Sequence, residues 1–421
     1  MAIKILIGGS PCTYWSIAQT NNRETKAEGM GWELFKNYLI AKEKFNPDFF
    51  LYENNKSASQ AIKDQIAEGF GVGVDPNVRF TYLNSALVSA QYRQRFYVTN
   101  FGDIEQPEDR GILLKDILEN RAVDPAKQQV DTITESVCTD DRSPRYIGSV
   151  PENKGTYLNG KQPSQQYRIY DTNAKGVAVT TAAITNVVEP IRVGCMPSPN
   201  GEIKNSQGMQ VYSSEGKSVN QTAQGGGMGA KTGLYAIPVE FEDGIPTKAI
   251  SCADGKTYTV YKVVNGVITI KEKEYPIKLK DGYYIIRKLT VRECARLQTM
   301  PDDYCKAVSD SQAYKALGNG WTAEVIIHLL NHALKDVPRD EEIVVLSMYD
   351  GIATGRYCLD KMGFTNVKYH AYEIDKYPIQ VAMDNYPDII QHGDAFAVRE
   401  DDWKAPQTRA EWLDDLLGGD L

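Results

Sequence analysis

At both ends of the chain, short apolar runs that suit buried strands alternate with stretches of helical periodicity. This alternation constrains the fold more than any other feature of the sequence. Near the N-terminus, the run 3–7 precedes the helical pattern of residues 32–44. Near the other end, the run 343–347 precedes a helical pattern at 356–362 and another run at 367–372. Strand–helix–strand alternation favours a parallel sheet covered by helices on both faces, so the sequence predicts an α/β fold.

A change in composition separates the middle of the chain from both ends. Residues 120–285 are rich in Gly, Ser, Thr, Asn, Tyr and Val, with many short strand-like runs and few helix signals. Helical patterns return at 290–297 and 323–334, before a charged linker that contains Pro338. We therefore expect a second, smaller domain that is mostly β and irregular, and a chain divided into residues 1–119, 120–285, 286–335 and 343–421.

Composition and charge disfavour several classes of protein. Of the 421 residues, 42% are hydrophobic and 24% are charged, which is ordinary for a globular protein. No apolar run approaches the roughly 20 residues that cross a bilayer, and the apolar stretch near the N-terminus is too short for a signal peptide. We therefore expect a cytoplasmic protein without membrane contact. The net charge of −8 disfavours a nucleic-acid partner on charge alone, although an acidic protein can carry a basic cleft.

Neither the cysteines nor the histidines have the spacing of a metal site. The seven cysteines are an odd number, are scattered and form no C-x-x-C pair, so the sequence indicates neither a disulfide framework nor a zinc ribbon. His328 and His332 are four residues apart, but no glutamate follows His328 as in the zinc motif H-E-x-x-H. We expect no bound metal.

In the last part of the chain, glycines and acidic residues follow successive strand candidates. Gly351 and Gly355 stand between a strand and a helix, where glycine allows a tight turn and close approach to a ligand. Glu373 ends the next strand, and an acidic residue there suits the hydroxyls of a ribose. Asp394 follows the third strand and could accept a hydrogen bond from an exocyclic amine. Because these residues come in order at successive strand ends, the sequence predicts a site for an adenosine-type cofactor.

At the other end of the chain, reactive side chains also follow strand candidates. Cys12 lies in the loop Gly-Gly-Ser-Pro-Cys directly after the first strand, where backbone amides can activate a thiol as a nucleophile. Glu53 ends the next strand. Arg93 and Arg95 alternate on an extended segment and therefore point the same way. A nucleophile, an acid and paired arginines suit addition to a polarised heteroaromatic ring.

These segments resemble the motifs of the C5-cytosine DNA methyltransferase family. The resemblance covers about residues 1–120 and 285–400, and the middle is unmatched, as expected for a target-recognition domain. The matching segments are GGSPC, ENN at 53–55, Gln91-x-Arg93-x-Arg95, RKLTVRECARLQ at 287–298 followed by Met300-Pro301-Asp302, Gly318-Asn319-Gly320-Trp321, SMYDGIATG, YEID and HGDA.

The order of these motifs differs from the order usual in the family. The cofactor motifs ordinarily come first, and here they come last, so the chain looks circularly permuted with its ends just before the catalytic strand. The resemblance implies a Rossmann-like large domain that depends on S-adenosylmethionine. Residues 1–119 would be its catalytic half and 343–421 its cofactor half. Residues 286–335 would return to it from a target-recognition domain at 120–285.

The resemblance also implies a mechanism. A methyl group would pass from S-adenosylmethionine to C5 of a cytosine flipped out of double-stranded DNA. Cys12 would add to C6 of the ring. Glu53 would hydrogen-bond the ring nitrogen and the exocyclic amine. Arg95 would polarise the ring carbonyl and hold Glu53, with Arg93 assisting.

Further residues receive roles from the same resemblance. Glu373 would bind the ribose of the cofactor, Ile374 would pack on the adenine, and Asp394 would meet the adenine amine. The remaining expected cofactor contacts are Tyr349, Asp350, Gly351, Gly355, Ala395, Pro11, Asn319 and Trp321. We expect DNA contacts from Ser16 and Arg23 in the loop after Cys12, and from Arg168, Lys175, Lys217 and the glycine-rich loop near Gly225.

Three residues depart from the family pattern, and alternatives follow from the fold. Thr13, Asn55 and Gly320 stand where the family commonly has an amide side chain, a valine and a serine, but no reacting group is lost. One alternative is an inert DNA-binding relative, which the intact reacting residues disfavour; another is an RNA methyltransferase, which the large middle domain disfavours. We expect a monomer in a bacterial cell. The sequence leaves open a cognate restriction endonuclease or a solitary role, and a host or phage gene.

Overall fold

The computed structural model describes residues 2–16, 23–119, 146–149, 168–170, 187–203, 206–222, 233–241, 246–252 and 255–411. The chain divides into two compact units. The first contains residues 1–121 and 188–421, and the second contains residues 122–187. In the second unit, the described residues form an antiparallel pair of strands, β5 (Tyr146–Ser149) and β6 (Arg168–Tyr170).

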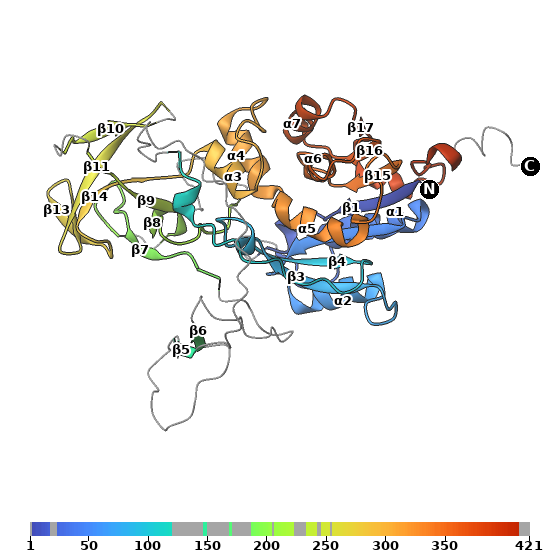
Figure 1. Cartoon of the computed structure of the whole chain (residues 1–421), viewed down its shortest axis with the longest axis horizontal. Coiled ribbons are helices and arrows are strands. Elements are labelled where there is room, and N and C mark those ends of the chain that lie inside the picture. Colours follow the sequence, from blue (N-terminus) through green and yellow to red (C-terminus); the bar gives the residue numbers. More distant parts are fainter. Residues whose placement is uncertain are drawn as a thin grey trace, which may run out of the picture. The chain divides into compact units, whose positions relative to one another are not determined.

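A seven-stranded sheet forms the centre of the first unit (Figure 1). Its first five strands are parallel, whereas β4 runs antiparallel to both of its neighbours. The predicted α/β fold is therefore confirmed as a mixed α/β fold. In spatial order the strands are β17 (Ile390–Gln391), β16 (Val367–Tyr372), β15 (Ile343–Met348), β1 (Ile3–Gly8), β2 (Phe49–Asn55), β4 (Gln94–Thr99) and β3 (Arg79–Asn84).

The two ends of the chain meet in the middle of this sheet. Strand β1 pairs in parallel with β15 over six residues, from Ile3 opposite Ile343 to Gly8 opposite Met348. All six residues of β15 are buried, as expected for a strand covered on both faces. The carboxyl ends of β1 and β15 therefore lie side by side, and so do the loops that follow them.

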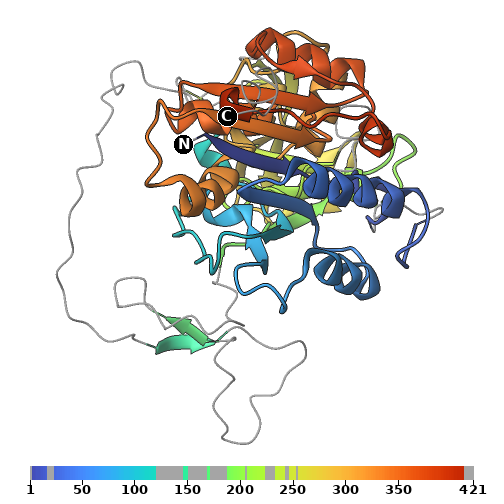
Figure 2. The same ribbon diagram turned by 90° about the vertical axis from the view of Figure 1, so that its right-hand side faces the viewer.

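Helices cover both faces of the sheet (Figure 2). On one face, Leu6 and Phe50 of the sheet share a buried cluster with Phe35 of α1 (Met30–Phe45) and Ile62 of α2 (Gln60–Phe70). On the other, α6 (Thr354–Lys361) approaches β1 so closely that a Cβ added at Gly355 would lie 2.1 Å from Ile7 Cδ1. Helix α5 (Ala323–Leu334) packs against α6, and α7 (Lys376–Asn385) follows β16.

A second sheet lies within the segment whose composition predicted β structure. It shares a buried cluster with α3 (Val291–Leu297) and α4 (Asp310–Asn319) through Ile285, Leu297 and Leu317. Its strands, in spatial order, are β13 (Lys273–Pro276), β12 (Val267–Ile270), β11 (Thr257–Val264), β14 (Gly282–Arg287), β9 (Leu234–Pro238), β8 (Gln210–Ser213) and β7 (Arg192–Cys195), while β10 (Ala249–Ser251) pairs with β11.

A short 3-10 helix, η2 (Ser85–Leu87), directly follows β3. The side chain of Asn84 accepts a hydrogen bond from the Ala86 amide and caps this turn, which ends the strand β3. The other short helices are η1 (Cys12–Tyr14), η3 (Leu114–Asp116), η6 (Gln207–Met209) and η7 (Ala395–Arg399).

The described residues contain neither a membrane-spanning helix nor a cluster of metal ligands. None of the helices in this part of the chain is both long enough and apolar enough to cross a membrane. In the same residues, no three His, Cys, Asp or Glu side chains gather as metal ligands would. His328 and His332 instead bond to the carbonyl oxygens of Glu105 and His328.

Candidate active site

One cavity of about 250 Å³ lies at the carboxyl ends of the central strands. Its walls come from the loop after β1, the end of β2, the start of β4, helix α4 with the turn after it, the loop after β15 and the segment between β16 and α7. The cavity brings together ten of the predicted site residues, namely Pro11, Glu53, Arg93, Arg95, Asn319, Trp321, Tyr349, Asp350, Gly351 and Glu373.

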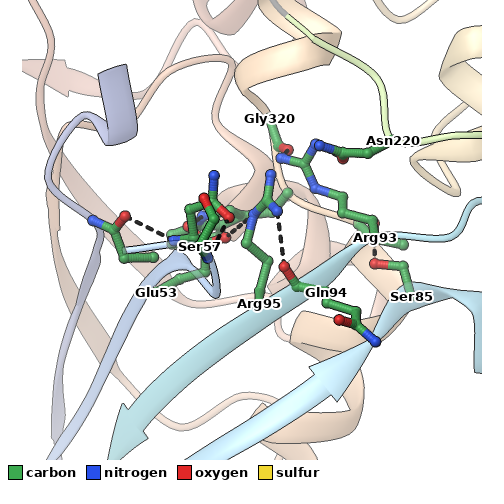
Figure 3. Close-up of polar contacts among 12 residues, drawn as sticks. Glu53, Ser57, Ser85, Arg93, Gln94, Arg95, Asn220 and Gly320 are labelled. Atoms are coloured by element: carbon green, nitrogen blue, oxygen red, sulfur yellow. Dashed lines mark hydrogen bonds and ion pairs between the residues drawn. The ribbon is translucent and has the colours of Figure 1, made fainter. Parts of the chain in front are cut away.

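A largely buried ion pair lies at the end of the cavity formed by β2 and β4 (Figure 3). Arg95 Nε lies 2.9 Å from Glu53 Oε1, and the two side chains are 7% and 12% exposed. The antiparallel pairing of β2 with β4 places these two residues close together, since Asn55 is opposite Arg95. Removing either partner of such a pair would leave a poorly solvated charge without compensation. The structure thus supports the expectation that Arg95 holds Glu53.

Arg93 contacts Asn220 and Gly320, which come from other segments of the chain (Figure 3). Its guanidinium donates to Asn220 Oδ1 at 3.1 Å, to the carbonyl oxygen of Gly318 at 3.2 Å and to that of Gly320 at 2.8 Å. The side chain is only 3% exposed. Arg93 therefore links the start of β4 to the segment after β8, to the end of α4 and to the turn after it.

The loop that carries Cys12 is held against β2. A Cβ at Gly9 would lie 2.3 Å from the carbonyl oxygen of Glu53, so only glycine allows this approach. Asn54 Nδ2 donates to the carbonyl oxygen of Ser10 at 2.9 Å, and Ser10 Oγ bonds to the Tyr52 hydroxyl at 2.7 Å. Burial raises the pKa of Tyr52, which keeps this hydroxyl neutral. Cys12 begins η1 directly after this loop, and its side chain lies outside the described part of the structure.

The loop after β15 contains left-handed backbone at two positions that border the cavity. Tyr349 has φ 62° and Gly351 has φ 65°. Such a conformation strains a residue other than glycine and is typical of functional loops. Glu373 at the tip of β16 accepts a hydrogen bond from the Gly351 amide at Oε2 (3.0 Å) and from the amides of Ile374 and Asp375 at Oε1 (2.8 Å each). The loop after β15 and the tip of β16 thus form one wall.

Asp350 is a partly buried acid in the same wall. Its Oδ1 accepts hydrogen bonds from Ser347 Oγ and from the Tyr369 hydroxyl, each at 2.7 Å. Its Oδ2 has no hydrogen-bond partner among the described residues. Burial, helped by the charge of Glu373, raises the pKa of Asp350 to about 6. A buried carboxylate oxygen without a donor suits a ligand that carries positive charge or a polar hydrogen.

Four residues expected at the cofactor do not line this cavity. The structure gives Gly355 a packing role against Ile7 and Tyr369, and Ala395 lies in the core beside α1. Asp394 caps η7 by accepting from the amide of Phe396 at 2.9 Å. Ile374 is 74% exposed beside Glu373, where an apolar side chain can still cover a ligand from outside.

The residues expected to contact DNA differ in their exposure and contacts. The prediction for Lys217 is wrong, because this lysine is 1% exposed and its amine donates to the carbonyl oxygens of Ala86 (2.7 Å), Ser89 (3.0 Å) and Ile112 (2.5 Å). Arg23 is half-buried and donates to the carbonyl oxygens of Ser57 and Trp15, and Ser16 is also half-buried. The Arg168 side chain, Lys175 and Gly225 lie outside the described residues.

Several residues of the cavity were not predicted. Lys315 of α4 forms an ion pair with Asp375 at 2.6 Å, and both line the cavity together with Gln312 and Pro378. The sequence could have indicated Lys315 as a site residue, because it lies one helical turn before Asn319 and so shares its helix face. Trp321, expected only at the cofactor, also donates from Nε1 to Glu53 Oε2 at 3.2 Å.

Comparisons with known proteins agree with this site. Residues 1–335 match the family described as C-5 cytosine-specific DNA methylase. The Type II methyltransferase M.HhaI of Haemophilus parahaemolyticus is 31% identical over 129 residues, which are 31% of this chain and 24% of that protein. The Orphan methyltransferase M.SPRI of Bacillus phage SPR is 23% identical over 373 residues, 76% of this chain and 80% of that protein.

Solved structures give more distant similarities. The methyltransferase EhMeth of Entamoeba histolytica is 12% identical with a TM-score of 0.40, over 79% of this chain and 78% of that one. The Dnmt2 methyltransferase of S. pombe is 11% identical with a TM-score of 0.36, over 79% of this chain and 77% of that one. The family match spans most of the chain and includes Glu53, Arg93 and Arg95. The chain belongs to the C-5 cytosine-specific DNA methylase family.

Proposed function

We propose that the protein transfers a methyl group from S-adenosylmethionine to C5 of a cytosine in duplex DNA, as a DNA (cytosine-5-)-methyltransferase. The observation that carries this proposal is a single cavity with two chemically distinct ends. One end has Pro11, which precedes the expected nucleophile Cys12, and the Glu53–Arg95 pair. The other end has the acids Asp350 and Glu373. A cytosine and a cationic methyl donor can therefore meet in one space.

The residues of the acidic end fit S-adenosylmethionine. The unpartnered Oδ2 of Asp350 suits its positively charged end, and Glu373 keeps lone pairs for the ribose hydroxyls. A Cβ at Gly351 would meet open space, which leaves the backbone accessible to a ligand. Bound there, the cofactor supplies an electrophilic methyl group.

The residues of the other end fit activation of a cytosine. Cytosine C5 is a poor nucleophile, and the Cys12 thiolate would add to C6 so that the electron pair of the C5–C6 bond moves to C5. Glu53 would hydrogen-bond the ring nitrogen and the exocyclic amine, while Arg95 would stabilise charge at the ring carbonyl. Once C5 is methylated and has lost its proton, Cys12 would leave C6. The buried position of Glu53 requires that the base leave the duplex.

We also propose that the chain is a circular permutation of the usual family order. The family match ends at residue 335, and the loop with Gly351 and Glu373 lies beyond it. The six-residue parallel pairing of β1 with β15 supports this, because it places both sets of motifs at one edge of one sheet. Residues 120–285 are proposed as the target-recognition domain, supported by the bond from Arg93 to Asn220.

Methyl transfer with a labelled donor tests the function. Wild type and Cys12→Ser are incubated with S-adenosylmethionine labelled in the methyl group, and with either mixed-sequence duplex DNA or RNA. We expect 5-methylcytosine in the DNA with wild type and none with the mutant. Label in RNA alone would contradict the choice of DNA. A folded protein that binds the cofactor but labels neither polymer would contradict the activity and support an inert relative.

A further inference from the structure

Trp321 lies between the two ends of the cavity and contacts Glu53. The indole Nε1 donates to Glu53 Oε2 at 3.2 Å, while Arg95 Nε lies 2.9 Å from the other oxygen, Oε1. Trp321 also lines the cavity itself. The two oxygens of the carboxylate are therefore held by two different segments, strand β4 and the turn after α4.

The turn that carries Trp321 is fixed independently of Glu53. Arg93 donates to the carbonyl oxygen of Gly320 at 2.8 Å, directly before Trp321. Gln298 donates from Nε2 to the carbonyl oxygen of Leu317 at 2.7 Å and accepts at Oε1 from Thr322 Oγ1 at 2.9 Å. Gln298 is fully buried. These bonds define the backbone on both sides of Trp321, so its N–H is already in place before any ligand binds.

Two donors at different oxygens restrict the carboxylate more than one donor can. With Arg95 alone, the carboxylate of Glu53 could rotate about its last carbon–carbon bond. With Trp321 bonded to the second oxygen, the plane of the Glu53 carboxylate is defined. Each oxygen then keeps a lone pair for a further hydrogen bond. The indole N–H of Trp321 can only donate a hydrogen bond. It therefore cannot accept the hydrogen bonds that the target cytosine would donate to Glu53.

We propose that Trp321 is a positioning residue that orients Glu53 toward the target cytosine, in addition to any contact with the cofactor. This inference rests on the proposed function. Glu53 would accept a hydrogen bond from the exocyclic amine and share a proton with the ring nitrogen, and both contacts must form together when Cys12 adds to C6. A misaligned carboxylate would slow that addition, because preorganised hydrogen bonds to the reacting ring are lost.

The decisive measurement is exchange of hydrogen at C5 in the absence of cofactor. In this reaction Cys12 adds to C6, C5 takes a proton from water, the original C5 hydrogen leaves as a proton, and Cys12 leaves C6. Release of tritium from duplex DNA labelled at cytosine C5 follows these steps without any methyl group. A residue that serves only the cofactor does not affect this rate, whereas a residue that orients Glu53 does.

The variants are Trp321→Phe, which removes the N–H and keeps an aromatic ring, and replacement of Trp321 by 3-benzothienylalanine, in which sulfur takes the place of the N–H at nearly constant shape. The second variant serves if the first does not fold. Trp403→Phe is the matched control, because its indole donates to the Tyr372 hydroxyl outside the cavity. Thermal unfolding and equilibrium dialysis of the cofactor establish that each variant is intact.

We expect both Trp321 variants to lower C5 exchange and methyl transfer by the same factor, roughly 10- to 100-fold for a hydrogen bond to a charged group, with cofactor affinity within about threefold of wild type. The control variant keeps the wild-type rates. Unchanged exchange with slower methyl transfer would overturn the inference in favour of a cofactor contact, and unchanged rates in both assays would overturn it entirely. A wild type that shows neither reaction fails the proposed function itself, and the inference with it.

Discussion

Asp350 combines a cost in stability with readiness to bind a ligand. One oxygen of its carboxyl group is held by Ser347 and Tyr369, and the other is buried without a hydrogen-bond partner among the described residues. Burial raises its pKa from the ordinary 3.8 to about 6. At neutral pH the folded protein therefore keeps a charged group in a place that disfavours charge, as binding sites often do.

Replacing Asp350 by asparagine should stabilise the free protein and weaken cofactor binding. Below pH 4 the aspartate is protonated in both the folded and the unfolded state, so it adds no penalty. As pH rises from about 4 to 6, the unfolded state loses its proton first, and stability falls by up to about 3 kcal/mol, from ~1.4 kcal/mol per pKa unit. Asp350→Asn should therefore be more stable than wild type above pH 6, with a gain that vanishes near pH 4.

Thermal unfolding across pH 4–8 and equilibrium dialysis of S-adenosylmethionine check this expectation. Cofactor affinity should fall by roughly tenfold or more, as expected for a lost hydrogen bond to a charged group. Asp103→Asn is the control, because Asp103 is 87% exposed and lies outside the cavity. A mutant no more stable than wild type at pH 7 would show that burial does not penalise this carboxylate.

At the scale of elements, the distance between α6 and the sheet affects the wall of the cavity that contains Asp350. Gly355 lets α6 approach Ile7 of β1, and it also lies beside the Tyr369 hydroxyl. The same hydroxyl donates to Asp350. A change in the position of α6 would therefore reach the cavity through Tyr369, although Gly355 does not line it.

Gly355→Ala tests this link. The new Cβ would lie 2.1 Å from Ile7 Cδ1 and 2.7 Å from the Tyr369 hydroxyl, so the helix or its neighbours must shift. We expect a loss of about 1–3 kcal/mol in the free energy of unfolding, typical of overpacking, and weaker cofactor binding. Gly69→Ala in α2 is the matched control, because its Cβ would meet the end of the Leu39 side chain at 3.2 Å and the Phe35 ring at an ordinary 3.5 Å, and alanine favours the helix. Equal stability of Gly355→Ala and wild type in chemical denaturation would contradict this account.

At the scale of the whole molecule, we infer that the sheet can form whichever of its halves comes first in the chain. Lys4 at the start of β1 forms an ion pair with Glu411 at 2.9 Å, so the two ends of the described chain lie close together. The connection between α5 and β15 runs through exposed residues such as Asp336 and Pro338. Cutting there and joining the present ends preserves every pair of strands.

A rearranged chain tests this independence. It begins at Val337, runs to Leu421, and continues through a short Gly/Ser linker to residues 2–336. We expect the same circular dichroism spectrum, cofactor affinity within about threefold and DNA methylation at the wild-type site, since permutation is tolerated at exposed connections. A second chain opened at Gly351 should lose cofactor binding, because the Gly351 amide bonds Glu373. If the chain opened at Val337 fails to fold, the connection after α5 carries more structure than its exposure indicates.

The sequence predicted elements and motif residues well where the signal is local. Helix α5 and strand β16 have the predicted bounds, because their apolar periodicity is uninterrupted and their ends are marked by polar residues. Glu53 was expected in the site because it ends a strand candidate, whereas Asp350 was expected from the family resemblance alone. Lys217 was misread, because its burial depends on carbonyl oxygens that Ala86, Ser89 and Ile112 supply from a distant segment.

The parts of the site that were missed depend on contacts between distant segments. Lys315 and Asp375 meet only because α4 packs beside α7, 60 residues further along the chain. The bond from Trp321 to Glu53 spans 268 residues. Neither spacing leaves a periodic signal in the sequence, so only the folded chain reveals these partners.

The pairing of β1 with β15 has a consequence for synthesis on the ribosome. Strand β1 is made more than 300 residues before β15, its neighbour on one side. Until β15 is made, β1 can pair only with β2. The other edge of β1, an apolar strand, exposes unpaired amides and carbonyls during that time. Such long-range pairing slows folding and exposes the nascent chain to aggregation. The order of strands in this chain therefore leaves β1 partly unpaired while the later strands are being made, and expression at low temperature or with chaperones should favour recovery of the folded protein.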